Sequence, residues 1–220
     1  MSPLQSIAEI SLSKAINLWS FLSLKGYRIL CMKFKGDGEK YAEEKRKLLE
    51  DICSKFTLDL SEISKYLRKI ANALIANGFS VKACKIKSKN RAIIGVSETF
   101  GQVPFEIGLC FDPVFNVPFI PGSTLKGAFR HALEELLVKE GLARSKAEII
   151  SDVVFGSQNY TGLVGVTDAY PIELNTGNRL FEPDVITPHY PNASTELDVE
   201  PKPIPFLTIA PGVTFQFYIY

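Results

Sequence analysis

The chain has few of the residues that build most metal and catalytic centres. Its 220 residues include two histidines and four cysteines, and the cysteines are scattered without a Cys-x-x-Cys pair. Zinc sites need closely spaced Cys and His ligands, so we expect no metal, and the sequence indicates no cofactor. Scattered cysteines are typical of reduced thiols in a cytosolic protein, so we expect a cytoplasmic location.

Two further absences concern membranes. The sequence lacks the run of about 18 apolar residues that a transmembrane helix needs, and its first residues show no basic segment before an apolar core, as a secretory signal would. Its 46% hydrophobic and 22% charged residues are typical of a globular protein. We therefore expect one large domain, or a domain with an appendage, and no membrane partner.

The net charge of +1 conceals two halves of opposite sign. Residues 1–100 hold 18 Lys and Arg against 10 Asp and Glu, a balance of +8, and residues 101–220 hold 7 against 14, a balance of −7. A basic half favours a polyanion as partner, and an acidic half favours basic protein neighbours. Solubilising charge on exposed helices explains the same asymmetry.

Residues 1–80 predict a helical region. Apolar residues recur at helical spacing over residues 7–24 and 39–56 and in a third segment after Asp59. Gly26 is expected to end the first helix. The region holds no catalytic constellation, which indicates a packing or docking module.

Residues 118–130, PFIPGSTLKGAFR, predict a strand end, a Pro-Gly turn and a helix. Ser123 is the expected N-cap, and Lys126 and Arg130 share one helix face. Gly127 inside the helix indicates a close approach of another backbone. Free amides beside two cations suit a phosphate, whereas an ordinary capped and solvated helix gives the same spacing.

A nucleotide-hydrolysing P-loop is excluded at this place. Gly122 and Gly127 have the Walker A spacing, but Ala128 and Phe129 follow instead of Lys and Ser or Thr. The lysine that reaches the phosphates and the hydroxyl that holds magnesium are therefore both missing.

Residues 82–91 form a second basic segment, without an acidic residue. From residue 85 onward the cations alternate, so an extended chain would place four of them on one side: Lys85, Lys87, Lys89 and Arg91. Such a row can follow a phosphate backbone. An edge strand protected by lysine is the alternative.

Residues 118–130 resemble the signature of the RAMP superfamily of CRISPR proteins, in which a PYIPGSSLKGALR-type segment opens the first helix of a ferredoxin-like domain. In that family this region lies against the guide RNA backbone. The resemblance implies an α+β, ferredoxin-like (RRM-like) domain over residues 81–220, with a loop-rich insertion at about 171–205. The matching positions are Pro118, Ile120, Pro121, Gly122, Ser123, Leu125, Lys126, Gly127 and Arg130.

Later segments resemble the family that forms the sixth subunit of the type III-B (Cmr) CRISPR effector complex. They are FGS at 155–157, VTDAYPI at 166–172, DVITPHY at 184–190 and PKPIPFLT at 201–208. The resemblance implies binding of guide RNA beside other RAMP subunits in antiviral defence, with RNA cutting assigned to a different subunit. Members of that family continue with another helix and strand, so we expect a core that lacks these, in a truncated or split product.

We therefore expect a non-catalytic RNA-binding subunit whose binding is largely independent of sequence. Its partners would be guide RNA, other RAMP subunits and, as an open question, target RNA. Two alternatives remain: a metal-independent endoribonuclease using His189 or Glu106, and an assembly scaffold without RNA contact. The expected RNA-binding residues are Lys85, Lys87, Lys89, Arg91, Gly122, Ser123, Thr124, Lys126, Arg130, His131 and His189.

Overall fold

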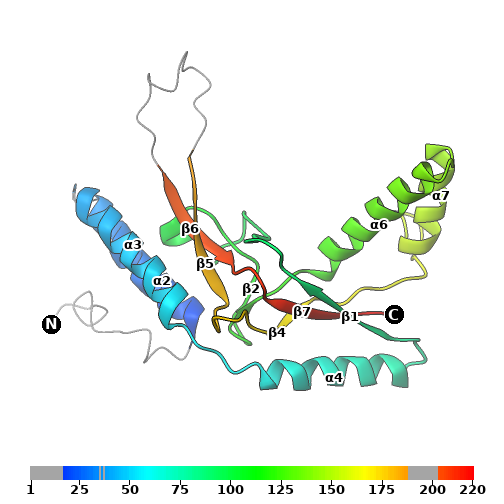
Figure 1. The fold of residues 1–220 in the computed structure, drawn as a ribbon, viewed down its shortest axis with the longest axis horizontal. Coiled ribbons are helices and arrows are strands. Elements are labelled where there is room, and N and C mark those ends of the chain that lie inside the picture. Colours follow the sequence, from blue (N-terminus) through cyan, green and yellow to red (C-terminus); the bar gives the residue numbers. More distant parts are fainter. Residues whose placement is uncertain (1–16, 35, 37, 188–202) are drawn as a thin grey trace, which may run out of the picture. The chain divides into compact units, whose positions relative to one another are not determined.

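The computed structural model describes residues 17–34, 36, 38–187 and 203–220 (Figure 1). Contacts divide the chain into two units, each of which combines segments that are distant in sequence. The first unit comprises residues 1–59, 87–118 and 174–213, and the second comprises residues 60–86, 119–173 and 214–220. The domain boundary expected after residue 80 stays a prediction.

The first unit combines helices with two antiparallel strand pairs. Helix α2 packs against α3 and α5, and α3 packs against β5 and β6. The strand pairs are β2–β3 and β5–β6. The bounds are α2 (Leu18–Phe34), α3 (Gly38–Lys55), α5 (Gln102–Phe105), β2 (Phe111–Asp112), β3 (Val117–Pro118), β5 (Phe181–Ile186) and β6 (Ile204–Ile209).

Helix periodicity explains α3, and a tertiary contact explains the length of α2. Leu48, Leu49 and Ile52 are the buried apolar residues of α3, as expected for one helix face. The prediction that Gly26 ends the first helix is wrong, because α2 continues to its last residue at 34. A Cβ at Gly26 would lie 2.7 Å from the carbonyl oxygen of Val103, so glycine lets α5 approach this helix.

The second unit contains a three-stranded sheet in the order β1-β7-β4, in which β4 and β7 are antiparallel. Helix α4 packs on β4, and α6 and α7 pack side by side (Figure 1). The ring of Phe129 on α6 lies 5.8 Å from that of Phe217 on β7. The bounds are α4 (Ser61–Ala76), β1 (Lys82–Lys87), α6 (Gly122–Lys139), α7 (Arg144–Phe155), β4 (Tyr170–Glu173) and β7 (Thr214–Ile219).

Three segments differ from the sequence prediction: two strands are shorter than expected, and an expected insertion contains a strand. The basic strand ends at Lys87, so Lys89 and Arg91 lie outside it. Of the expected buried strand at 91–96, only Ala92 makes a β-bridge, with Ile209, and Val96 is 58% exposed. The expected insertion at about 171–205 contains a regular strand, β5, which pairs with β6.

The described residues thus combine helices with antiparallel sheets, which confirms the mixed fold class; the ferredoxin-like arrangement stays a prediction. In the part of the chain that the structure describes, no helix is both long and apolar enough to cross a membrane.

Candidate nucleic-acid interface

The start of α6 is capped by a distant carboxylate and not by its own serine. The N-cap residue is Pro121, no side chain caps the helix from that position, and Ser123 is exposed. The expectation that Ser123 is the N-cap is therefore wrong. The amide of Gly122 instead donates to Oδ1 of Asp168 at 2.7 Å. A carboxylate here complements the positive end of the helix dipole, so a phosphate at this amide would have to displace it.

The next amides of the first turn also have partners. Those of Thr124 and Leu125 donate to the carbonyl oxygen of Pro121 at 3.0 and 3.1 Å. The expected phosphate contacts of Gly122, Ser123 and Thr124 stay predictions. The geometry leaves little free donor capacity for them, because three of the four amides at positions 122–125 already donate within the chain.

Arg130 is occupied by acceptors from its own chain. Its Nη1 donates to the carbonyl oxygen of Gly156 at 2.8 Å, its Nη2 to Asp152, and its Nε to Glu134 at 3.1 Å. The hydrogen bond to Asp152, followed by that to Glu134, raises the pKa of the guanidinium above its ordinary value. Arg130 therefore joins α6 to the end of α7, and its predicted RNA contact would compete with these partners.

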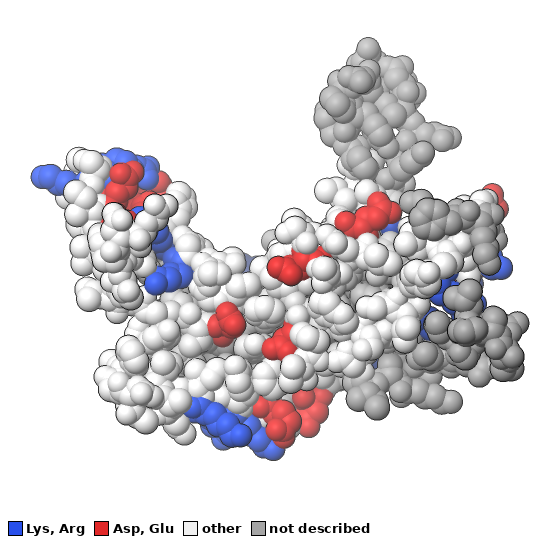
Figure 2. Space-filling model, turned by 180° about the vertical axis from the view of Figure 1, so that it is seen from behind, with Lys and Arg blue, Asp and Glu red and all other residues white. Residues whose placement is uncertain are grey.

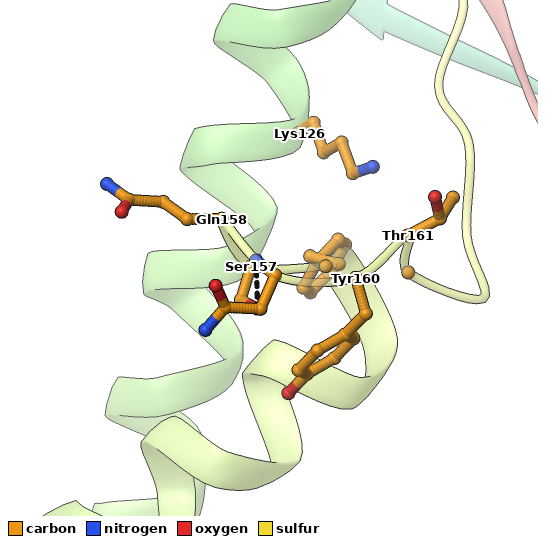
Figure 3. A pocket seen from close by; sticks show the side chains of 9 residues that line it. Lys126, Ser157, Gln158, Tyr160 and Thr161 are labelled. Carbon is orange, nitrogen blue, oxygen red and sulfur yellow. Dashed lines mark hydrogen bonds between the residues drawn. The ribbon is translucent and has the colours of Figure 1, made fainter.

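Lys126, one turn earlier, faces a pocket of about 500 Å³ (Figure 3). The other lining residues belong to the segment 155–162, which leaves the end of α7, and none of them is acidic. Figure 3 shows Lys126 leaving α6 toward the side of Thr161, while Gln158 points the opposite way. The pocket therefore combines one ammonium group with hydroxyl and amide side chains.

In residues 156–162 the backbone returns close to itself at two glycines, and we call this close approach the neck. Gly156 has a φ of +89°, which favours glycine, and forms a β-bridge with Thr161. A Cβ at Gly162 would lie 2.3 Å from the nitrogen of Gly156, so neither position has room for a side chain. Inside the neck, the amide of Ser157 donates to the carbonyl oxygen of Tyr160 at 3.0 Å. We call residues 157–161 the neck loop.

The other predicted cations lie on different elements. Lys85 and Lys87 are exposed on β1, an edge strand of its sheet, and Lys85 lies 3.6 Å from Glu173. Arg91 lies 3.3 Å from Asp184 and donates to the carbonyl oxygen of Pro183. Lys85 belongs to the second unit, whereas Lys87, Lys89 and Arg91 belong to the first. β1 ends at Lys87, so Lys89 and Arg91 lie beyond the strand that carries Lys85 and Lys87, and a shared face of all four cations stays a prediction.

Of the two histidines, His131 is exposed on α6, beside Arg130 in sequence. His189 lies outside the described residues, so its predicted role is not addressed by this structure.

Surface charge in the second unit is mixed. Figure 2 shows basic and acidic side chains next to one another on α4 and at the end of the α6–α7 pair. Lys65 pairs with Glu62 at 2.6 Å on α4, and Arg144 pairs with Glu135 at 2.8 Å between α7 and α6. Many cations here are thus balanced by neighbouring acids, unlike Lys126.

The described residues contain no group of three or more His, Cys, Asp or Glu side chains arranged to hold a metal ion. Glu106, weighed as a catalytic residue, lies in the first unit and pairs with the buried Lys45 at 3.2 Å. This ion pair gives Glu106 a structural role.

The RAMP superfamily model matches residues 34–205. The chain belongs to the RAMP superfamily. It is 36% identical over 198 residues to "CRISPR system CMR subunit Cmr6" of Saccharolobus solfataricus, covering 88% of this chain and 66% of that relative. The chain thus spans slightly less than two thirds of that relative's length.

Structural similarity agrees with this RAMP assignment. A chain in the cryo-electron microscopy structure of "the Type III-B Cmr-beta bound to cognate target RNA" is 33% identical and superimposes with a TM-score of 0.83. The match covers 99% of this RAMP chain and 82% of the other. The resemblance inferred from the motifs, to RAMP proteins and to the sixth Cmr subunit, is thereby confirmed.

The neck loop of this RAMP chain is the part of the site that sequence reasoning missed. Its residues SQNYT stand between two glycines, a pattern typical of an exposed turn. That pattern could have identified a loop, but its position beside Lys126 depends on how α7 packs against α6.

Proposed function

We propose that the chain is a non-catalytic, RNA-binding subunit of a cytoplasmic type III-B CRISPR effector complex, in which it contacts guide RNA and neighbouring RAMP subunits during antiviral defence. Membership of the RAMP superfamily supports this proposal. So do the similarities to a Cmr subunit and to a chain of a Cmr assembly with target RNA.

Lys126 is the observation that carries the RNA-binding part of the proposal. Its ammonium faces an open pocket whose lining contains no carboxylate. Arg130 on the same helix and Arg144 on α7 both form ion pairs with acids of the chain. An ammonium without a neighbouring acid is available to a phosphate group, and each phosphate neutralised on a single strand adds salt-dependent affinity.

The non-catalytic part has separate support. Glu106 forms an ion pair with Lys45, and the described residues bring no three metal-ligating side chains together. A general acid or base exchanges a proton with the reacting group, whereas the carboxylate of Glu106 neutralises the buried ammonium of Lys45.

For the fold, we propose that the sheet β1-β7-β4 with α4 and α6 represents the ferredoxin-like core of the family. The contact of α4 with β4 and the contact of Phe129 with Phe217 support this assignment.

The RNA-binding part is tested by titrating the full chain with a labelled single-stranded RNA at several salt concentrations. Lys126→Ala should lower the affinity and reduce the slope of log K against log salt by about 0.7, the value for one phosphate of a single strand. Lys139→Ala, at an exposed lysine in the last turn of the same helix, is the matched control and should leave the slope unchanged. Equal slopes for Lys126→Ala and the wild type would favour a scaffold without RNA contact.

The non-catalytic part is tested by incubating the full chain with labelled RNA, with and without EDTA. We expect intact RNA in both reactions. Cleavage that disappears in Glu106→Gln or His189→Ala would overturn this part of the proposal.

A further inference from the structure

We propose that the pocket between Lys126 and the neck loop holds one nucleotide of a single RNA strand, with its phosphate at Lys126 and Thr161 and its base on the ring of Tyr160. This inference rests on the proposed RNA-binding function and adds a base contact to it. The pocket of about 500 Å³ lies within the range of small-ligand sites.

The phosphate position follows from two side chains that approach from different elements. Lys126 extends from α6 toward the side on which Thr161 lies (Figure 3). The ammonium supplies charge and three donors, and the hydroxyl of Thr161 supplies one further donor. A phosphate oxygen accepts from both groups, and the lining contains no carboxylate that would repel it.

The base position follows from Tyr160. Tyr160 is 48% exposed and lines the same pocket, and its ring projects from the neck loop on the side away from Lys126 (Figure 3). Proteins that bind single strands combine a cation for the backbone with an exposed aromatic ring, because every base can stack on an aromatic face. The base would therefore be held without being read, consistent with recognition independent of sequence.

The loop is held in shape before any RNA binds. The amide of Asn159 donates to Oγ of Ser157 at 3.2 Å, and the carbonyl oxygen of Tyr160 accepts from the amide of Ser157. Arg130 holds the neck through the carbonyl oxygen of Gly156. A preformed loop loses less conformational freedom on binding, which favours affinity. Arg130 would thus support RNA binding by positioning the loop, without contacting a phosphate.

The test measures binding of the full chain to fluorescein-labelled oligoadenylate and to an abasic oligomer with the same number of phosphates. Tyr160→Ala should weaken oligoadenylate binding about tenfold, leave the abasic oligomer unaffected and leave the salt slope unchanged. Tyr160→Phe keeps the ring and should stay within about twofold of the wild type. Thr161→Val should weaken both oligomers, because it removes a phosphate donor.

The outcomes separate this inference from the function on which it rests. If Lys126→Ala reduces the salt slope but Tyr160→Ala binds oligoadenylate as the wild type does, RNA binding stands and the base contact is wrong. If the wild type binds neither oligomer, both proposals fail. If Tyr160→Ala leaves RNA affinity unchanged but prevents association with a neighbouring subunit, the pocket is a protein contact and the nucleotide site is overturned.

Discussion

A lysine of α3 and a lysine of α6 differ in burial and in whether an acid of the chain lies beside them. On α3, the side chain of Lys45 is 6% exposed and its ammonium lies 3.2 Å from Glu106 and 5.9 Å from the ring centre of Tyr41. On α6, Lys126 faces an open pocket without an acid in its lining. The first lysine contributes to the structure of its own unit, whereas the second is available to an external anion.

Arg130 shows that a position on α6 does not by itself leave a cation available to an external anion. It lies one turn after Lys126 on α6, yet its guanidinium is occupied by Glu134, Asp152 and the carbonyl oxygen of Gly156. Acceptors that the fold brings near a cation therefore decide whether it serves stability or binding. The following predictions test that distinction.

The largest expected effect concerns the close contact between the first residue of α6, Gly122, and the backbone at Val166. Gly122→Ala would place a Cβ 2.4 Å from the carbonyl oxygen of Val166, so we expect a loss of about 3 kcal/mol in the free energy of unfolding. Gly127→Ala is the matched control, because a Cβ there meets no described atom within 4 Å outside the backbone of its own helix. The expectation that Gly127 lets another backbone approach is therefore wrong, and the variant should stabilise the helix by up to about 1 kcal/mol. Chemical denaturation measures both, and equal effects of the two variants would contradict the close contact at Gly122.

The next effect separates Lys45 from Lys126. Glu106→Ala leaves the buried ammonium of Lys45 without its carboxylate, and we expect a loss of about 2 kcal/mol. Lys45→Met should be milder, because the side chain of Glu106 is 47% exposed and water can solvate it. Denaturant midpoints measure both; a larger loss in Lys45→Met would show that packing, and not charge, governs this pair.

A third comparison uses the two cations of α6. Arg130→Ala removes hydrogen bonds to two acids and a carbonyl, and we expect a loss of about 1–2 kcal/mol. Lys126→Ala should change stability by less than about 0.5 kcal/mol, as surface substitutions usually do. Thermal unfolding measured for both variants decides this, and a destabilised Lys126→Ala would contradict a binding role for that lysine.

The smallest expected effect is a change in alkaline pH dependence. Burial, and secondarily the charge and hydrogen bond of Glu106, raise the pKa of Tyr41 above its ordinary value. Because the pKa of Tyr41 is higher in the folded state, Tyr41 contributes to stability. This contribution is complete below the unfolded-state pKa of about 10 and is lost as pH rises through the folded-state pKa. In Glu106→Ala the pKa of Tyr41 should fall toward the ordinary value, measured by ultraviolet absorbance; an unchanged titration would mean that burial alone sets it.

The sequence predicted the helices α3, α6 and α7 from their helical periodicity. Of these three, α3 buries an apolar stripe, whereas α6 buries Gly122 and Leu125 and α7 buries Ala147 and Ser151. It did not predict the cap of α6, because Asp168 lies 46 residues beyond Gly122. The partner of Arg130 on α7, Asp152, was missed for the same reason. The expected strand at 91–96 was predicted from an apolar run. Ala92 forms a β-bridge with Ile209, and the carbonyl oxygens of Ile94 and Val96 accept from the amides of Cys110 and Gly108, but the segment is not a regular strand.

The candidate site was predicted in part. Periodicity placed Lys126 and Arg130 on one helix and family resemblance placed that helix near RNA. Local spacing could not distinguish the two cations, since their availability depends on α7 and the neck loop. Similarly, the basic row at residues 85–91 looked continuous because side-chain alternation in a sequence does not show where a strand ends.

Because the backbone closes at Gly156 and Gly162, the five residues between these glycines can be exchanged as a unit. The backbone at Gly156 contacts the backbone at Gly162 through glycines and not through the side chains of the loop. Arg130, which lies on α6, donates to the carbonyl oxygen of Gly156 and stabilises this contact. Exchanging SQNYT for other residues would therefore alter what the pocket accepts while α6 and α7 keep their packing. Ligand preference could diversify here independently of the scaffold.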